Sequence, residues 1–207
     1  MPKVSQEYLD GRRSEILDAA IVCFSRDGLH RTTMKNVVRE SGLSPGAIYN
    51  YFNSKEEIVE AIAERRQERE RELVLSAIER GPADNTLARV RDAFLDQLGN
   101  PKERLRRRVS VQLWAEAQRS TGVRKIVRRS FEEPRRLLTE ALLDAQKKGV
   151  IAGWADPDAI ACFVIAAFHG LVLQREWDSN FSAEPHKLLL DLLLKAVARK
   201  HEPAIVE

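Results

Sequence analysis

Side chains that donate hydrogen bonds are grouped between residues 33 and 55 of the 207-residue chain. Lys35 and Asn50 have polar tips of the kind that read the edges of bases. Gly46 and Ala47 are small, so a helix that carries them could lie close to the floor of a DNA groove. The remaining donors suit phosphate oxygens, and they are Thr33, Ser44, Tyr49, Tyr51 and Lys55. These residue types predict a surface that binds nucleic acid.

Two short helices joined by a tight turn are expected to position these side chains. Thr33 is a good N-cap for the first helix, and Gly42 in the turn is able to take a positive φ. Ser44 caps the second helix and Pro45 occupies its first position, where the missing N–H costs nothing. The apolar residues expected to face a preceding helix are Val37, Val38, Leu43, Ile48 and Phe52. A helix-turn-helix from Thr33 to Phe52 is therefore predicted.

Two interpretations of this segment are open from the residues alone. An ordinary helical hairpin would leave the polar side chains merely solvated. However, Tyr49 and Tyr51 lie on a polar face, where solubility alone would favour Glu or Lys. The first turn of the second helix also offers free backbone N–H groups and the positive end of a helix dipole, which suit a phosphate. We therefore favour DNA binding.

The first quarter of the chain also resembles a known family in many residues at fixed offsets. Those residues are Ile16-Leu17-Asp18-Ala19-Ala20, Phe24, Gly28, Thr32-Thr33, Gly42-Leu43-Ser44-Pro45-Gly46-Ala47-Ile48-Tyr49-Asn50-Tyr51-Phe52 and Ser54-Lys55-Glu56-Glu57. Together they closely resemble the N-terminal signature of the TetR family of transcriptional repressors. The resemblance implies phosphate contacts from Thr33, Ser44, Tyr49, Tyr51 and Lys55. It implies contacts with base edges from Lys35, Pro45, Gly46, Ala47 and Asn50.

Almost every other segment has the period of a helix, and no run of alternating residues is long enough for a strand. We expect an all-α fold with an N-terminal three-helix helix-turn-helix DNA-binding domain at residues 10–56. A long helix at about 54–80 links it to a larger C-terminal helical ligand-binding and dimerisation domain at 57–202. Other helices are expected at residues 12–26, 84–98, 101–119, 121–148, 157–178 and 185–200. Pro134 predicts a kink or a split in its helix.

The composition is typical of a globular protein, with 43% hydrophobic and 31% charged residues and a net charge of only +3. Any basic surface must therefore be local. Cys23 and Cys162 belong to no paired motif and lie in apolar helical patterns, so both are expected to be reduced and buried in a cytoplasmic protein. The N-terminus has no signal-peptide pattern. The apolar stretch 159–174 is shorter than the roughly 20 residues of a membrane span, so we expect a buried helix.

No sequence feature supports catalysis or a cofactor. The chain has no phosphate-binding glycine loop, no nucleophile motif and no cluster of histidine and cysteine at metal-ligand spacing. The histidines are scattered, at His30, His169, His186 and His201. We therefore expect neither an enzyme nor a metal-binding protein.

Two stretches near the C-terminus are apolar nearly all round, at residues 159–168 and 188–194. Helices of this kind are buried, either inside one chain or between two. The TetR resemblance implies that the last two helices form a four-helix dimer bundle with their symmetry mates, which is the arrangement we favour. The same region is expected to hold an effector pocket, although each candidate could instead be plain core. The candidate lining residues are Phe94, Trp114, Phe131, Phe163, Phe168 and His169.

Arginines are dense between residues 104 and 136. One interpretation is a solvated helix face paired with acidic neighbours. The other is a site for an anionic effector such as a fatty acyl thioester, since arginine suits phosphate and aromatic residues suit a lipid tail. Both interpretations are open at this point.

The predicted function is a dimeric transcriptional repressor that binds palindromic operator DNA and is released by a small-molecule effector, hydrophobic or of acyl type. Its expected partners are double-stranded DNA, the effector and a second copy of the chain, with no membrane. One alternative is a helical small-molecule or lipid carrier without a DNA role. Another is a protein that coats DNA non-specifically, which the low net charge disfavours.

Overall fold

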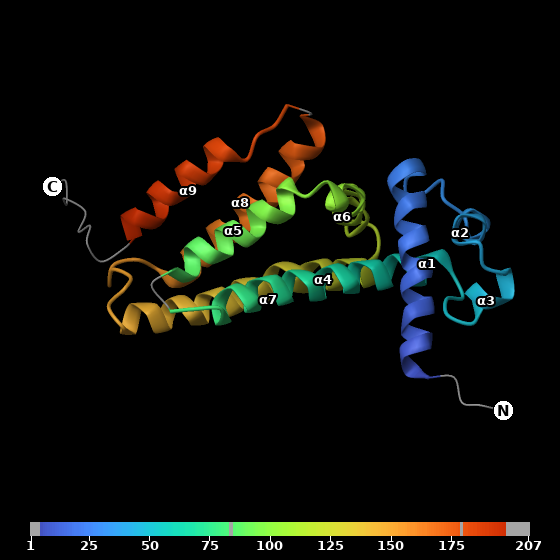
Figure 1. Ribbon diagram of the computed structural model, residues 1–207, viewed down its shortest axis with the longest axis horizontal. Helices are drawn as coiled ribbons and strands as arrows, with labels where there is room; N and C mark the ends of the chain where they lie inside the picture. Colours follow the sequence, from blue (N-terminus) through green and yellow to red (C-terminus); the bar gives the residue numbers. More distant parts are fainter. Residues whose placement is uncertain (1–4, 83–84, 179, 198–207) are drawn as a thin grey trace. The chain divides into compact units, whose positions relative to one another are not determined.

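The computed structural model describes residues 5–82, 85–178 and 180–197, and helices form nearly all of their regular secondary structure (Figure 1). The all-α fold expected from the periodicity is confirmed. The chain packs as two compact units, each made of two segments. The first unit is Met1–Gln67 with Arg104–Val127, and the second unit is Glu68–Glu103 with Arg128–Glu207.

This division differs from the domain boundary expected at residue 56, because residues 104–127 pack with the N-terminal helices. α-Helical periodicity reports which face of a helix is apolar, and it does not report which other helix covers that face. The functional division into domains 10–56 and 57–202 stays a prediction, and residues 198–202 lie outside the described residues.

The helical elements follow one another as α1 (Gln6–Asp27), α2 (Met34–Ser41), α3 (Pro45–Tyr49), α4 (Lys55–Glu79), α5 (Thr86–Gly99), the 3-10 helix η2 (Pro101–Glu103), α6 (Arg104–Glu116), α7 (Thr121–Lys147), α8 (Pro157–Trp177) and α9 (Glu184–Val197). Most agree with the expected ranges to within a few residues. α1 begins earlier than expected, because the Ser5 side chain accepts a hydrogen bond from Tyr8 N (3.3 Å) and caps the helix. The helix ends expected at Asp84 and Lys200 lie outside the described residues.

Two of the expected helices differ in form. Residues 101–119, expected to form one helix, form η2 and then α6. α6 ends at Glu116 and is followed by a turn with shorter-range hydrogen bonds, such as Arg119 N to Glu116 O (2.8 Å). α7 runs without interruption through Pro134, so the expected split is wrong. A proline removes only one helical N–H, and the turns on both sides of it keep a helix of 27 residues continuous. The kink stays a prediction.

One apolar core holds the first unit together. Ile16 and Phe24 of α1 are fully buried, within a stripe that has the spacing of an amphipathic helix. Val37, Ile48 and Phe52 pack into the same core from α2, α3 and the loop after α3. Residues of α4 and α6 complete it, and they include Ile58, Ile62, Val109 and Leu113. The expected packing of the two short helices against the first helix is confirmed.

The turn between α2 and α3 depends on a glycine. Gly42 has a φ of 69°, a left-handed conformation that residues with a Cβ rarely adopt. Helix caps lie on both sides of the turn, as expected. Thr33 Oγ1 accepts from Asn36 N (3.3 Å), and Ser44 Oγ accepts from Ala47 N (3.2 Å). The glycine and the two caps therefore define where α2 and α3 begin and end.

In the second unit, the later parts of α4 and α7 lie side by side, joined by an ion pair between Arg71 and Glu133 (3.1 Å; Figure 1). α5 packs against both α8 and α9. α8 begins as its Asp-Pro sequence predicts, because Asp156 accepts hydrogen bonds from the N–H groups of Asp158 and Ala159.

An ion pair links α7 to the first turn of α8. Arg135 Nε donates to Asp158 Oδ1 (2.8 Å), and this pairing lowers the pKa of the Asp158 carboxyl below its usual value. Thr139 Oγ1 donates to the same carboxylate (3.3 Å). Because the folded-state pKa is lowered, the stabilisation is present above the unfolded pKa of about 4 and is lost as the pH falls below it.

α8 is covered on one side only. Among the described residues it is the helix that is long and apolar enough to cross a membrane by length and composition, a test that core helices of soluble proteins also pass. Val164, Ile165 and Phe168 are buried on its covered side. Cys162 lies on the other side and is exposed, so its expected burial is wrong, whereas Cys23 is buried as expected. The helix is apolar on both sides, and only 39% of its most apolar stretch is buried within the chain.

Neighbouring leucines on α7 offer a matched test of this packing. Leu142 is 1% exposed and Leu143 is 42% exposed. Leu142→Ala should lower the free energy of unfolding by about 2–5 kcal/mol, because the change leaves a cavity in the core. Leu143→Ala should change it by less than about 0.5 kcal/mol. Urea unfolding followed by circular dichroism measures both, and equal losses from the two variants would contradict this orientation of α7.

Two glycines of the helix-turn-helix should respond to alanine in opposite directions. Gly42→Ala should destabilise the protein by about 1–2 kcal/mol, because alanine adopts the left-handed conformation only at a cost. Gly46 lies in α3, and apart from its chain neighbours and the backbone of its own helix no described atom is within 4 Å of where its Cβ would stand. Gly46→Ala should therefore stabilise the protein by up to about 1 kcal/mol through its helix propensity. Parallel urea titrations compare the two, and a loss of stability in Gly46→Ala would disprove the open space around α3.

Candidate DNA-binding surface and effector site

Most of the residues expected to contact DNA are exposed on the helix-turn-helix. α3 has only five residues, so Asn50 is its C-cap and Tyr51 lies just beyond it. Tyr49 is 50% exposed, whereas Tyr51 is half-buried against the core. Ala47 is also half-buried, and the remaining exposed members are Thr33, Lys35, Ser44, Pro45, Gly46 and Asn50. Because Ile48 is fully buried, Tyr49 of α3 and the capping residues Ser44 and Asn50 are turned toward solvent.

The hydroxyl groups of the two N-caps are used differently within the fold. Thr33 Oγ1 donates to Asn36 Oδ1 (2.6 Å), and the Thr33 N–H donates to the same oxygen (2.8 Å). This is a capping box, whose partner Asn36 the sequence analysis did not identify. Ser44 Oγ only accepts from Ala47 N, so its hydroxyl hydrogen keeps the ability to donate to a phosphate.

Lys55 is directed toward the backbone of its own unit. Its Nζ donates to the carbonyl oxygens of Leu29 (3.0 Å) and His30 (3.4 Å), in the turn between α1 and α2. An ammonium group has three hydrogens, so a further acceptor can still be bound. The phosphate contact expected of Lys55 stays a prediction. In the structure, Lys55 holds this turn to the start of α4.

The same turn is held by α6, through a residue that the sequence analysis missed. Gln112 Oε1 accepts from Leu29 N (2.9 Å), and Gln112 Nε2 donates to Phe24 O (3.0 Å). An amide side chain does both because it has a donor and an acceptor. Gln112 lies 83 and 88 residues from these partners along the chain, so no local pattern signals the contact.

Charge fixes the end of α1 to α2. Arg26 pairs with Glu40 of α2 (3.1 Å) and with its neighbour Asp27 (3.2 Å). Hydrogen bonds to Asp27 and Glu40 raise the pKa of Arg26 further above its usual value, so this link does not titrate near neutral pH. Cys23 lies one turn earlier, where burial raises the pKa of its thiol and keeps it protonated.

Four candidate effector residues come together in the second unit. Phe94 stacks on Phe168 and Phe131 stacks on His169, in each case with ring centres 4.2 Å apart. His169 Nε2 lies 3.7 Å from Oε1 of Glu70, a buried carboxylate of α4. The group therefore combines aromatic rings with two buried titratable side chains, contributed by α4, α5, α7 and α8.

The two other candidates lie elsewhere. Trp114 belongs to the first unit, where the guanidinium of Arg66 lies 5.2 Å from the centre of its ring. Phe163 is 53% exposed on the uncovered side of α8. The effector roles of all six residues stay predictions.

Several of the dense arginines between residues 104 and 136 have partners within the protein. Arg128 pairs with Glu132 (2.6 Å) and Arg136 with Glu140 (2.7 Å), both one helical turn apart. Arg124 donates to the carbonyl oxygens of Ala117 and Gln118 (both 2.8 Å) at the end of α6. These contacts favour a solvated, paired helix face, and a site for an anionic effector among these arginines stays untested.

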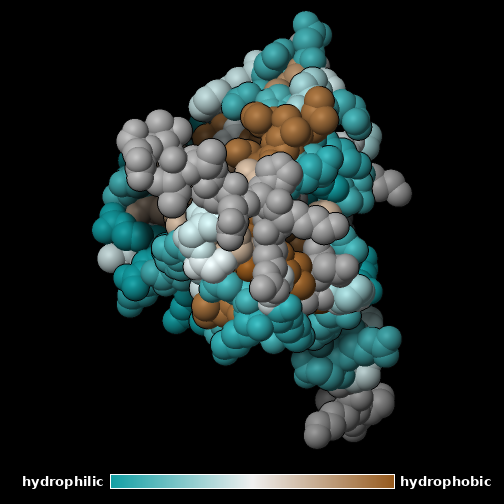
Figure 2. Space-filling view, turned by 90° about the vertical axis from the view of Figure 1, so that its left-hand side faces the viewer, coloured by the Kyte–Doolittle hydropathy of each residue, from teal (hydrophilic) through white to brown (hydrophobic). Residues whose placement is uncertain are grey.

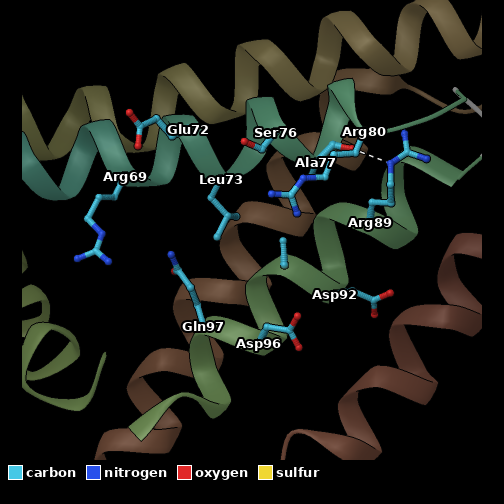
Figure 3. Close-up of a pocket in the computed structure, with 11 residues that line it drawn as sticks. Arg69, Glu72, Leu73, Ser76, Ala77, Arg80, Arg89, Asp92, Asp96 and Gln97 are labelled. Carbon is cyan, nitrogen blue, oxygen red and sulfur yellow. Dashed lines mark hydrogen bonds between the residues drawn. The ribbon is translucent and has the colours of Figure 1, made fainter. Parts of the chain in front are cut away.

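A cavity of about 440 Å³ lies between α4 and α5, and most of the residues that line it are polar or charged (Figure 3). The charged residues of the wall are Arg69, Glu72, Arg80, Arg89, Asp92 and Asp96. Arg89 Nε donates to Ala77 O (2.7 Å), the hydrogen bond drawn in Figure 3, and so caps the end of α4. None of the six candidate effector residues is in the described wall of this cavity.

Two family models match the chain in succession. The model described as "Bacterial regulatory proteins, tetR family" matches residues 16–62. The model described as "BetI-type transcriptional repressor, C-terminal" matches residues 86–199, more than half of the chain. The two matches follow the order of the helix-turn-helix and the C-terminal helices.

Individual relatives agree with the family models. The chain is 52% identical over 63 residues to the uncharacterized HTH-type transcriptional regulator YfiR of Bacillus subtilis (strain 168), a match that covers 30% of this chain and 31% of that protein. It is 28% identical over 151 residues to the HTH-type transcriptional regulator UidR of Escherichia coli (strain K12), which covers 68% of this chain and 69% of that protein. The match to the first relative thus spans about a third of that protein's length.

A solved structure extends the likeness to nearly the whole chain. Salmonella enterica GusR is 27% identical and has a TM-score of 0.70, over 93% of this chain and 99% of that chain. Family models, relatives and fold agree on a DNA-binding transcriptional regulator that is not an enzyme. The chain belongs to the TetR family of transcriptional regulators.

Proposed function

We propose that the chain is a dimeric repressor that binds a near-palindromic operator and leaves it when a small molecule binds among the C-terminal helices. The observation that carries the proposal is the exposed surface formed by α3 and its caps Ser44 and Asn50, with Tyr49 outside and Ile48 in the core. Gly46 and Ala47 add no bulk near the start of this helix, which allows close approach to base edges. The description of the C-terminal family model supports repression.

Within this proposal the candidate DNA-contacting residues divide into two roles. Phosphate contacts position the protein on the duplex, and base contacts select the sequence. The phosphate contacts are assigned to Thr33, Ser44, Tyr49, Tyr51 and Lys55. The base contacts are assigned to Lys35, Pro45, Gly46, Ala47 and Asn50.

α9 supports the dimer, because its leucines face outward. The exposed side carries Leu188, Leu189, Leu192 and Leu193, each 41–64% exposed. On the other side, Asp191 pairs with Arg91 of α5, and Lys187 lies 3.5 Å from Asp92. A monomer would leave the leucines in water while holding charges against its own core. A second copy of the chain, related by a two-fold axis, would cover them.

α8 has an exposed apolar stripe of its own. Its members share one side of the helix and are Ala159, Cys162, Phe163, Ala166 and Trp177. Hydrophobic residues also reach the surface at the end of the second unit where α7 and α9 terminate, between hydrophilic neighbours (Figure 2). A bundle of α8 and α9 with their symmetry mates would bury both exposed faces.

Two-fold symmetry increases the DNA-sequence specificity that the small surface of one helix-turn-helix can give. One helix-turn-helix contacts few bases, whereas two copies read half-sites about 34–36 Å apart, one turn of DNA. An effector then needs only to prefer, by a few kcal/mol, a conformer in which this spacing is wrong. Such a repressor works in the cytoplasm, where bacterial DNA lies.

Operator binding is measured with fluorescent duplexes from the region upstream of the gene that encodes the chain. Tyr49→Ala should weaken binding to the preferred duplex about tenfold or more, because each protomer loses a hydrogen bond to a charged phosphate. Trp154→Ala removes an aromatic side chain of similar exposure (55%) from the second unit and should leave binding unchanged. Equal binding to every duplex would indicate DNA coating instead, and no binding to any duplex would indicate a ligand carrier.

The dimer is measured through the two cysteines, which act as probe and internal control. Cys162 on the exposed stripe should react quickly with a maleimide in dilute protein and slowly at concentrations where the dimer forms. Cys23 is buried with a raised pKa and should stay unreactive throughout.

A pair of charge substitutions completes the dimer test. Leu192→Glu should give a monomer in sedimentation experiments and make Cys162 reactive at every concentration, because a charge enters the apolar face. Leu105→Glu, at a leucine of the first unit that is 40% exposed, should leave the dimer intact. Fast reaction of Cys162 in the unaltered chain at every concentration would refute the dimer.

A further inference from the structure

A small apolar cavity lies between α5, α8 and α9 in the second unit. Its volume is about 20 Å³, room for about one water molecule. Most of its wall is aliphatic or aromatic and includes Phe94 and Phe168, whose rings stack on each other. Leu190 of α9 contributes one side. The charged member of the wall is Arg91.

Arg91 binds two carboxylates through different nitrogens. Asp92, its neighbour on α5, accepts from Nε (3.0 Å) and Nη2 (2.8 Å). Asp191 of α9 accepts from Nη1. Nη1 is therefore the position at which an anion from elsewhere could replace a side chain without disturbing Asp92.

The two partners at Nη1 differ in their access to water. The side chain of Arg91 is 8% exposed, whereas that of Asp191 is 36% exposed. If the pair separates, Asp191 can hydrate at little cost, but Arg91 stays inside with part of its charge unmatched. This difference in exposure favours replacement of Asp191 by another anion over separation of the pair without replacement, because an incoming anion keeps the buried guanidinium of Arg91 neutralised.

We propose that this cavity is a binding site for small monocarboxylates with an apolar body, which take the place of Asp191 on Arg91 Nη1. The exchange conserves charge, since one carboxylate leaves the guanidinium as another arrives. The apolar body of the ligand packs on the Phe94–Phe168 pair in the space that opens as Leu190 withdraws. A cationic ligand is repelled by Arg91, and an inorganic anion gains nothing from the apolar wall.

Exchange at Arg91 would reach the dimer through α9. The Arg91–Asp191 pair joins α5 to α9, and the exposed leucines of the proposed dimer face are on the same helix. A bound carboxylate therefore frees α9 to shift and alters how two protomers meet. This consequence rests on the proposed function, whereas the binding site itself does not.

Calorimetry on the full chain, without DNA, tests the site with benzoate and hexanoate as probes. Both should bind saturably at one site per chain, and benzylamine and sulfate should give no saturable heat. Asp191→Asn should tighten benzoate binding about tenfold, because the competing charge is removed while the side-chain size is kept. Arg91→Met should abolish binding. Arg136→Met, which removes an exposed arginine of α7, should bind benzoate as the unaltered chain does.

Several results would overturn the proposal. Benzoate binding that survives Arg91→Met would do so, as would an affinity that Asp191→Asn leaves unchanged or weakens. Sulfate that binds as tightly as benzoate would show a general anion contact instead. Thermal unfolding checks that Arg91→Met is folded, and if it is not, Asp191→Asn decides the question. Operator binding is measured separately, so carboxylate binding without operator binding refutes the repressor alone, and the reverse result refutes this site alone.

Discussion

The turn that follows α1 is held by side chains from two later helices, and the first unit is organised around these contacts. Gln112 of α6 binds the carbonyl of Phe24 and the N–H of Leu29, while Lys55 of α4 binds the carbonyls of Leu29 and His30. α2 and α3 come directly after this turn. The placement of the candidate DNA-contacting residues therefore depends on the start of α4 and on α6, which lies much later in the sequence, and the loss of the partner of Leu29 N would destabilise the whole unit.

The second unit shows a different constraint, which is an excess of apolar surface over what one chain can cover. α8 is apolar on both sides and is buried on one, and α9 turns Asp191 toward Arg91 while its leucines remain outside. Hydrophobic burial is the main favourable term in folding, so exposed leucines at helical spacing indicate a further partner. Arg91, the α5 partner in that ion pair, also lines the cavity beside Phe94 and Phe168. The proposed dimer face and the cavity therefore share one buried charge.

The helix-turn-helix could be predicted from the sequence because its determinants are local. A threonine and a serine at the caps, Gly42 in the turn and apolar residues at helical spacing all act within a few residues of one another. The DNA contacts of the site residues stay predictions, and the structure adds two local contacts to them: Lys55 binds backbone carbonyls and the Thr33 hydroxyl is used in a capping box. In the effector region, four of the six candidate residues lie together in the structure, whereas Trp114 and Phe163 lie elsewhere. The candidates were chosen mainly by aromatic residue type, and residue type alone does not report where a side chain lies in the fold.

By itself, the sequence determined that this protein is all-α, that residues 33–52 form a helix-turn-helix and that the chain belongs among TetR-type regulators. Those properties follow from periodicity, caps and short motifs, which act over a few residues. Only the tertiary structure decided that residues 104–127 pack with the DNA-binding helices, that Gln112 clamps the end of α1 and that one side of α8 remains uncovered. The physical reason is that burial and ion pairing join residues up to 100 positions apart, and no local pattern specifies which distant partner a side chain will meet.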